Sequence, residues 1–240
     1  ITEINTDLAG ITKPEKVILT IKLSGTGYQN NYDLWIYPAV TNVDIPDNIH
    51  ISTALDKATL QRLDKGETVM LFPDHKAIND ISVGGLFIPD YWNYRMFKGI
   101  SENNKKPVSP GTMSILTDPK HPLFNDFPTE FHSNWQWWAI AKNSRPFILD
   151  NTPAEYKPVV QVVDNIERNH KLGIVFEFRT GKGKLLVCTA DLTPVLDKPE
   201  VQQFYGSLLK YASSEAFDPQ FEITPADLIS LFSSKASARK

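Results

Sequence analysis

A strand–helix–strand pattern early in the chain indicates its fold class. Residues 49–51 and 68–72 predict short strands, and residues at about 54–65 predict a helix between them that ends at Gly66. Strands separated by a helix and short links favour a parallel sheet in an α/β domain. The residues able to cap the helix are Ser52 and Thr53, and its apolar residues are Leu55, Ala58, Leu60 and Leu63.

The second half of the chain predicts further strands and two helices. Residues 172–179 and 184–189 predict a hairpin, because two β-rich runs flank a glycine-containing turn. Residues 114–117 fit either a strand or the start of a helix, and residues 81–111 are expected to be irregular. Short apolar runs occupy 145–150 and 158–164, helices are expected at about 199–213 and 226–232, and 233–240 is expected to fray.

The first 40 residues predict a separate β-hairpin. Residues 17–23 and 32–38 read as strands, with Leu34 and Ile36 on one face of the second strand and Asp33, Trp35 and Tyr37 on the other. This pair resembles the end of an immunoglobulin-like β-sandwich whose earlier strands are missing. A lone hairpin is only marginally stable in water, so it is expected to pack against another part of the protein.

Composition limits the classes of function. The chain has 240 residues and a net charge of −3, so no basic field attracts nucleic acid. The single cysteine, Cys188, excludes an internal disulfide framework and the usual zinc patterns. No apolar run is long enough to predict a membrane span.

The absence of a starting methionine and of a signal peptide suggests an excised or mature fragment. Its expected units are 1–40 (a strand remnant), 41–218 (an α/β domain) and 219–240 (a helical or disordered tail).

Three of the five tryptophans fall within four positions, in the sequence FHSNWQWW at 131–138. Tryptophan serves either as a large core anchor or as an apolar platform for ligands and partners. Aromatic faces stack on the C–H faces of sugars, while Asn and His side chains bind hydroxyl groups. Core or interdomain packing and sugar contact therefore both remain open. The candidate ligand-binding residues are Trp92, His132, Asn134, Trp135, Trp137 and Trp138.

Other motifs favour structural roles. The GKGK sequence at 181–184 lacks the spacing of a phosphate-binding P-loop and is expected to form a tight turn between strands. Cys188 has no flanking glycine of a nucleophile elbow and is expected to be a buried thiol. Asp191 follows a strand at an edge where α/β sheets bind ligands, but it is equally well placed to cap a helix. No metal ligands, cofactor or catalytic residues are expected.

The chain resembles the C-terminal part of Bacteroidetes-type proteins of glycoside hydrolase family two, the β-galactosidase group. The resemblance covers most of the chain. It rests on residues 110–112, 118–122, 127–138, 162–165 and 181–188, with the preceding strand at 32–38. It implies a terminal module similar to class I glutamine amidotransferases, hence a three-layer flavodoxin-like α/β fold. The two catalytic glutamates of such enzymes would lie in a TIM barrel that this chain is too short to include.

Three functions compete on these grounds. The resemblance implies a non-catalytic accessory domain that packs against other domains or subunits of a large glycosidase, which would be periplasmic or secreted and could form a homo-oligomer. The alternative is a carbohydrate-binding module that uses the tryptophans. A free-standing hydrolase or amidotransferase-like enzyme is the third, and it is disfavoured because no Cys–His–Glu pattern appears.

Overall fold

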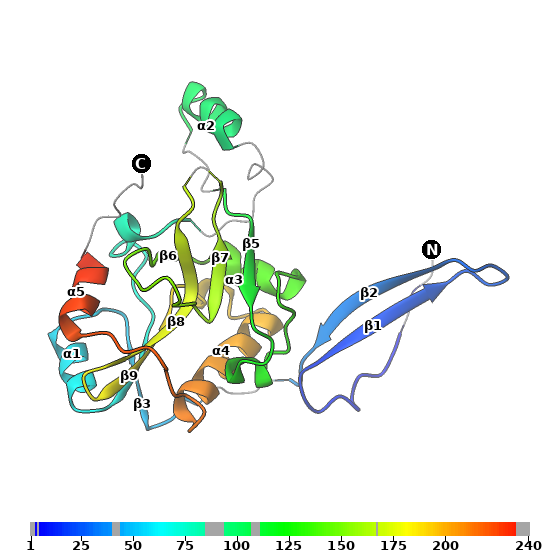
Figure 1. The fold of residues 1–240 in the computed structure, drawn as a ribbon. Helices are drawn as coiled ribbons and strands as arrows, with labels where there is room; N and C mark the ends of the chain where they lie inside the picture. Colours follow the sequence, from blue (N-terminus) through cyan, green and yellow to red (C-terminus); the bar gives the residue numbers. More distant parts are fainter. Residues whose placement is uncertain are drawn as a thin grey trace.

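The computed structural model describes residues 3, 5–39, 44–84, 94–106, 111–166 and 168–233. Within these residues the chain forms a two-stranded sheet followed by a seven-stranded sheet with helices (Figure 1). The strands are β1 (Glu15–Lys22), β2 (Gln29–Ile36), β3 (Ile49–Ser52), β4 (Thr68–Leu71), β5 (Ser114–Thr117), β6 (Phe147–Ile148), β7 (Val160–Val163), β8 (Lys171–Thr180) and β9 (Gly183–Cys188). The α-helices are α1 (Lys57–Asp64), α2 (Tyr94–Asn103), α3 (Trp138–Lys142), α4 (Pro199–Ser213) and α5 (Pro225–Ser233).

The larger sheet is mixed. Its order is β3-β4-β9-β8-β7-β5, with β6 paired to β8 outside this path. The neighbours β3, β4 and β9 run parallel, whereas β9, β8, β7 and β5 alternate in direction. The predicted parallel sheet is therefore confirmed for three strands only. The predicted hairpin of β8 and β9 is confirmed, and its tight connection requires these two strands to be antiparallel.

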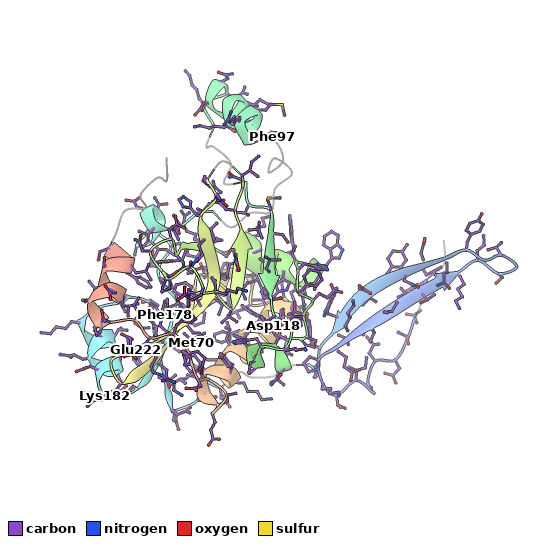
Figure 2. The ribbon with its side chains drawn as sticks, viewed as in Figure 1. Met70, Phe97, Asp118, Phe178, Lys182 and Glu222 are labelled. Atoms are coloured by element: carbon purple, nitrogen blue, oxygen red, sulfur yellow. The ribbon has the colours of Figure 1, made fainter. Side chains whose placement is uncertain are left out.

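Successive side chains of the central strands point to opposite faces of this sheet. Both faces therefore carry buried apolar residues, and helices cover both faces. On β4, Met70 belongs to one buried cluster while Val69 and Leu71 belong to the other. Figure 2 labels Met70 and, on β8, Phe178 of the second cluster. The first cluster is closed by α4 through Val201, Phe204 and Leu208, and the second by α1 and α5 through Leu63, Leu228 and Leu231.

The helix ends differ in detail from the sequence prediction. Helix α1 begins at Lys57, and its cap is Asp56, whose carboxylate accepts a hydrogen bond from Thr59 N at 2.8 Å. Ser52 and Thr53 are therefore not the cap, since Ser52 Oγ instead donates to Ala54 O. Helix α4 has the predicted bounds, and α5 extends the expected span 226–232 by one residue at each end, with Pro225 starting the helix as predicted.

Residues 81–111 were expected to be irregular, and this is wrong for residues 94–103, which form α2. Helix α2 stands apart from the sheet (Figure 1) and leaves Met96 and Ile100 exposed. The helical spacing of Met96, Phe97 and Ile100 was a signal that sequence reasoning missed beside the helix-disfavouring Gly99. Residues 114–117, which fitted either a strand or a helix, form β5.

The N-terminal hairpin of β1 and β2 is antiparallel and extends away from the larger sheet (Figure 1). Its register places Val17 opposite Leu34 and Lys16 opposite Trp35, which confirms the predicted alternation of the second strand. One face therefore carries an apolar stripe, much of which is exposed. The exposed members of this stripe are Ile21, Leu23, Tyr28, Tyr32 and Leu34.

Candidate functional site

The tryptophan-containing segment lies along the edge of the larger sheet. Strand β5 pairs with β7 on one side, and the segment leading into the tryptophans runs along its other side. Thr117 N donates to Phe131 O at 3.0 Å, Thr117 Oγ1 donates to Glu130 O at 2.6 Å, and Leu116 forms a β-bridge with His132. These contacts hold the segment against β5.

Asn134 positions the short turn that carries the first two tryptophans. Its side-chain oxygen accepts a hydrogen bond from Gln136 N at 3.2 Å, which caps the 3₁₀ turn η4 (Trp135–Trp137). Gln136 is buried, and its Nε2 donates to Pro128 O at 3.0 Å. Asn134 thus acts as a structural cap, and the turn decides which side chains face inward.

Trp137 faces inward and is fully buried. Its indole Nε1 donates to Thr129 Oγ1 at 2.8 Å, so its polar atom is satisfied inside the core. Edge-to-face contacts surround it, with ring centroids 5.2 Å from Phe127, 5.3 Å from Phe204 and 6.2 Å from Phe124. Trp137 is therefore a core anchor and is not available to a ligand.

Trp135 and Trp138 face outward. Trp135 is 81% exposed, Trp138 is 49% exposed and Phe131 is 63% exposed. The exposed His132 ring meets Phe131 edge to face at 4.7 Å, and its Nδ1 lies 2.9 Å from Ser133 O. We call Phe131, His132, Trp135 and Trp138 the aromatic edge. Sequence reasoning omitted Phe131 from the candidates, although its place beside His132 signalled it; Trp92 lies outside the described residues.

The buried side of the same segment holds the N-terminal hairpin. Tyr37 stacks on Phe127 with ring centroids 6.2 Å apart, and its hydroxyl donates to Gln136 Oε1 at 2.5 Å. Lys16 Nζ lies 2.6 Å from Glu130 Oε1, and Asp33 and then Glu130 raise the pKa of this lysine. The tryptophan segment therefore joins the two sheets on its inner side and presents aromatic rings on its outer side.

Two motifs were expected to be structural, the GKGK turn and the thiol of Cys188, and the structure confirms both. Residues 181 and 182 form the turn between β8 and β9, and Gly181 has a φ of +58°, which confirms the tight turn. Cys188 is fully buried in β9, and burial raises the pKa of its thiol to about 12, so it stays protonated. Asp191 accepts a hydrogen bond from Thr193 N at 3.2 Å and is exposed at the end of β9.

Within the described ranges, no cluster of three or more His, Cys, Asp or Glu side chains is arranged to hold a metal ion. Over the same part of the chain, no helix has both the length and the apolar character to cross a membrane.

Comparison with known families divides the chain where the two sheets meet. Residues 50–233 match a family model described as "Domain of unknown function (DUF8487)". Residues 1–38 match a different one, described as "Domain of unknown function (DUF8488)". No curated protein matches the chain.

Proposed function

The chain belongs to the family described as domain of unknown function (DUF8487), and from this premise we propose that it is a non-catalytic accessory domain of a large glycoside hydrolase. Its role would be to pack against other domains or subunits of a β-galactosidase-like polypeptide, periplasmic or secreted. The observation that carries the proposal is the aromatic edge, which exposes three large rings beside the base of the hairpin.

The aromatic edge has the character of a docking surface. Aromatic residues, tryptophan and tyrosine above all, dominate the binding energy of protein interfaces, because their large rings bury apolar area with little loss of side-chain entropy. Trp135 and Trp138 are exposed although their neighbour Trp137 is fully buried. Exposing two tryptophans to water is unfavourable unless a partner covers them.

The N-terminal hairpin supports the same role. Its apolar stripe of Ile21, Leu23, Tyr28, Tyr32 and Leu34 is substantially exposed, and its strands pair only with each other among the described residues. We propose that this stripe packs against a further β-sheet, as in an immunoglobulin-like sandwich. The separate family match of residues 1–38 is consistent with a module distinct from the α/β domain.

The fold contributes support of a coarser kind. Helices on both faces of a partly parallel sheet fit the flavodoxin-like, amidotransferase-like module that the sequence resemblance implies. The fully buried Cys188, whose pKa is raised, suits a domain without thiol chemistry. On these grounds we propose the flavodoxin-like, amidotransferase-like fold for residues 41–218.

The first experiment measures the mass of the native polypeptide with an antibody raised against this chain. The proposal expects a band well above the 27.1 kDa of the chain itself. A band at the mass of the chain would contradict it, because no further domain of the same polypeptide would then exist to cover the aromatic edge.

A second experiment tests the surface itself. Trp135→Ala combined with Trp138→Ala in the native polypeptide should lower its thermal stability and increase protease cleavage near this domain, while leaving the melting of the isolated chain nearly unchanged. Ile229→Ala, at an exposed apolar position on α5, is the matched control and should change neither. Equal effects of the control and the double variant would count against docking through the aromatic edge.

Carbohydrate binding is the second candidate, and the 81% exposure of Trp135 favours it specifically. A flat exposed indole suits the C–H face of a pyranose. Titration of the chain with galactosides, mannosides and plant oligosaccharides, followed by tryptophan fluorescence, separates the two functions. A saturable fluorescence shift that Trp135→Ala abolishes would support sugar binding. The absence of a shift with any of these sugars would favour the docking function instead.

A further inference from the structure

Two adjoining hollows lie where β4 and β9 end, and they share no lining residue with the aromatic edge. Their volumes are about 630 Å³ and about 610 Å³, within the range of small-molecule sites. Both are lined by His75, Lys76 and Asp191, so they adjoin through these residues. The carboxyl ends of parallel strands are where open α/β sheets bind ligands.

The walls of these hollows are held by backbone hydrogen bonds. Arg145 N donates to Thr189 O at 3.0 Å, and Asp191 N donates to Asn143 O at 2.8 Å. The residues after α3 are therefore tied to the end of β9. Because the site is already ordered, binding a ligand there would cost less conformational entropy of the protein.

The first hollow has a largely apolar wall. Phe72 and Tyr205 meet at a ring-centroid distance of 6.0 Å, and Ile51, Leu192 and Leu196 complete this side. A wall of aromatic and aliphatic side chains suits the apolar face of a ring. It does not suit a simple inorganic ion.

The second hollow is positively charged. Lys76, Lys142 and Arg145 line it, against the single carboxylate of Asp191. Arg145 Nε donates to Ser82 Oγ at 3.0 Å, which orients the guanidinium group. None of these three cations takes part in an ion pair between described residues. An anionic group bound there would receive charge-assisted hydrogen bonds.

Polar groups at the junction suit hydroxyl groups. His75 Nε2 lies 3.0 Å from Thr189 O, and because a carbonyl oxygen only accepts, Nε2 carries the proton. His75 Nδ1 is then the ring atom able to accept from a hydroxyl. The carboxylates of Asp74 and Asp191 line the first hollow as further acceptors.

We propose that the two hollows form one cleft for a small acidic sugar, a pyranose that carries a carboxylate or a phosphate. The ring lies against Phe72 and Tyr205, its hydroxyls meet His75 and Asp191, and its anionic group meets Lys142 and Arg145. This site is separate from the aromatic edge and does not depend on the proposed accessory role.

Calorimetric titration of the full 240-residue chain with glucuronate, glucose 6-phosphate and glucose tests the proposal. At least one acidic sugar should bind, and at least about tenfold more tightly than glucose, as expected for one charged hydrogen-bonded contact. A preference for glucuronate identifies a carboxylate site and a preference for glucose 6-phosphate a phosphate site; both outcomes support the cleft. Failure of both acidic sugars to bind, or equal binding of glucose, would overturn it.

Three lysine and arginine variants locate the binding. Lys142→Gln and Arg145→Gln should each weaken the acidic sugar about tenfold or more. Lys120→Gln, an exposed lysine outside both hollows, is the matched control and should have no effect. Arg145 also donates a hydrogen bond to Ser82, so Arg145→Gln can lower the melting temperature of the chain. In that case the Lys142→Gln variant, at an exposed position, tests the site.

Equal weakening by Lys120→Gln and Lys142→Gln would reveal unspecific attraction and overturn the assigned site. Trp135→Ala should leave the affinity unchanged. These experiments can therefore support the proposal for the cleft and reject the proposal for the docking surface, or the reverse.

Discussion

Glu177 is a carboxylate on β8 in a mostly buried setting. Its pKa is raised to about 7, chiefly by burial; the hydrogen bond from Tyr211 opposes this rise, the nearby Asp218 adds to it, and the charge of Lys184 opposes it. Tyr211 OH donates to Glu177 Oε2 at 2.9 Å, so the side chain has a defined partner. A raised pKa means that the folded chain binds this proton more tightly than the unfolded chain does.

We predict that the stability of the chain falls as pH rises from about 4.5 to about 7 through this group. Below that range Glu177 is protonated in both states, and above it the folded state holds a buried charge. Glu177→Gln should therefore be more stable than the wild type at pH 8, by on the order of 2 kcal/mol, and nearly equal to it at pH 4. Urea unfolding of both proteins across this range measures the difference. A difference that is the same at both pH values would refute the raised pKa.

Trp137 and Trp135 lie two positions apart and should respond oppositely to truncation. Trp137→Ala removes a fully buried ring and leaves a cavity among Phe124, Phe127 and Phe204, so we expect a loss of about 3–5 kcal/mol. Trp135→Ala removes an exposed ring and should change the isolated chain by less than about 0.5 kcal/mol. Chemical denaturation measures both, and a large loss in Trp135→Ala would mean that its ring is covered in solution.

Among the elements, the turn between β8 and β9 packs closely against the end of α1. A Cβ atom on Gly183 would lie 2.6 Å from Leu63 O and 2.6 Å from Glu67 O. These are backbone atoms, which cannot rotate away as a side chain does. The glycine is therefore required by this close approach of the GKGK turn to the end of α1.

Gly183→Ala should destabilise the chain by about 1–3 kcal/mol or more through this overlap. Gly206→Ala is a matched control inside α4, where an added Cβ meets no atom within 4 Å. The control should stabilise the chain by about 0.5–1 kcal/mol, because alanine is the better helix former. Thermal unfolding of the two variants checks both signs, and similar shifts in the same direction would contradict the packing argument.

Elements with strong local signals were predictable from the sequence. Helix α4 has a complete apolar face, and β8 and β9 flank a glycine turn, so both were predicted closely. The start of α1 was not, because Ser52, Thr53 and Asp56 all have capping side chains and only tertiary structure selects Asp56. The direction of β5 and β7 depends on pairing between distant segments, which local periodicity does not encode.

Over the whole molecule, a few side chains join the hairpin to the α/β domain. Tyr37 stacks on Phe127 and donates to the buried Gln136, and Lys16 pairs with Glu130. Sequence reasoning singled out the tryptophan segment but could not tell its inner from its outer side chains. That distinction arises from the 3₁₀ turn η4, which places Trp137 in the core and Trp135 in solvent.

Tyr37→Phe should loosen this joint while keeping the stacked ring. The variant leaves Gln136 Oε1 without its donor in a buried site, which costs about 1–3 kcal/mol. We expect faster proteolytic cleavage of the hairpin, with little change in the melting of the α/β domain. Lys13→Gln, at an exposed lysine before β1, serves as control, and identical cleavage of both variants would argue against the joint.

The strand order also has a consequence for the kinetics of folding. Strands β8 and β9 are joined by a short turn. Strands β4 and β9 pair across a long intervening segment, for example Thr68 with Lys184. This second pairing therefore requires that most of the domain has been synthesised and that the long loop between the two strands has closed. We therefore expect β8 and β9 to pair in the transition state and β4 to join afterwards. Phe178→Leu should slow refolding, whereas Val69→Ala should mainly speed unfolding, in stopped-flow measurements. The parallel edge, whose strand ends border the two hollows, would then be the last part of the sheet to become ordered.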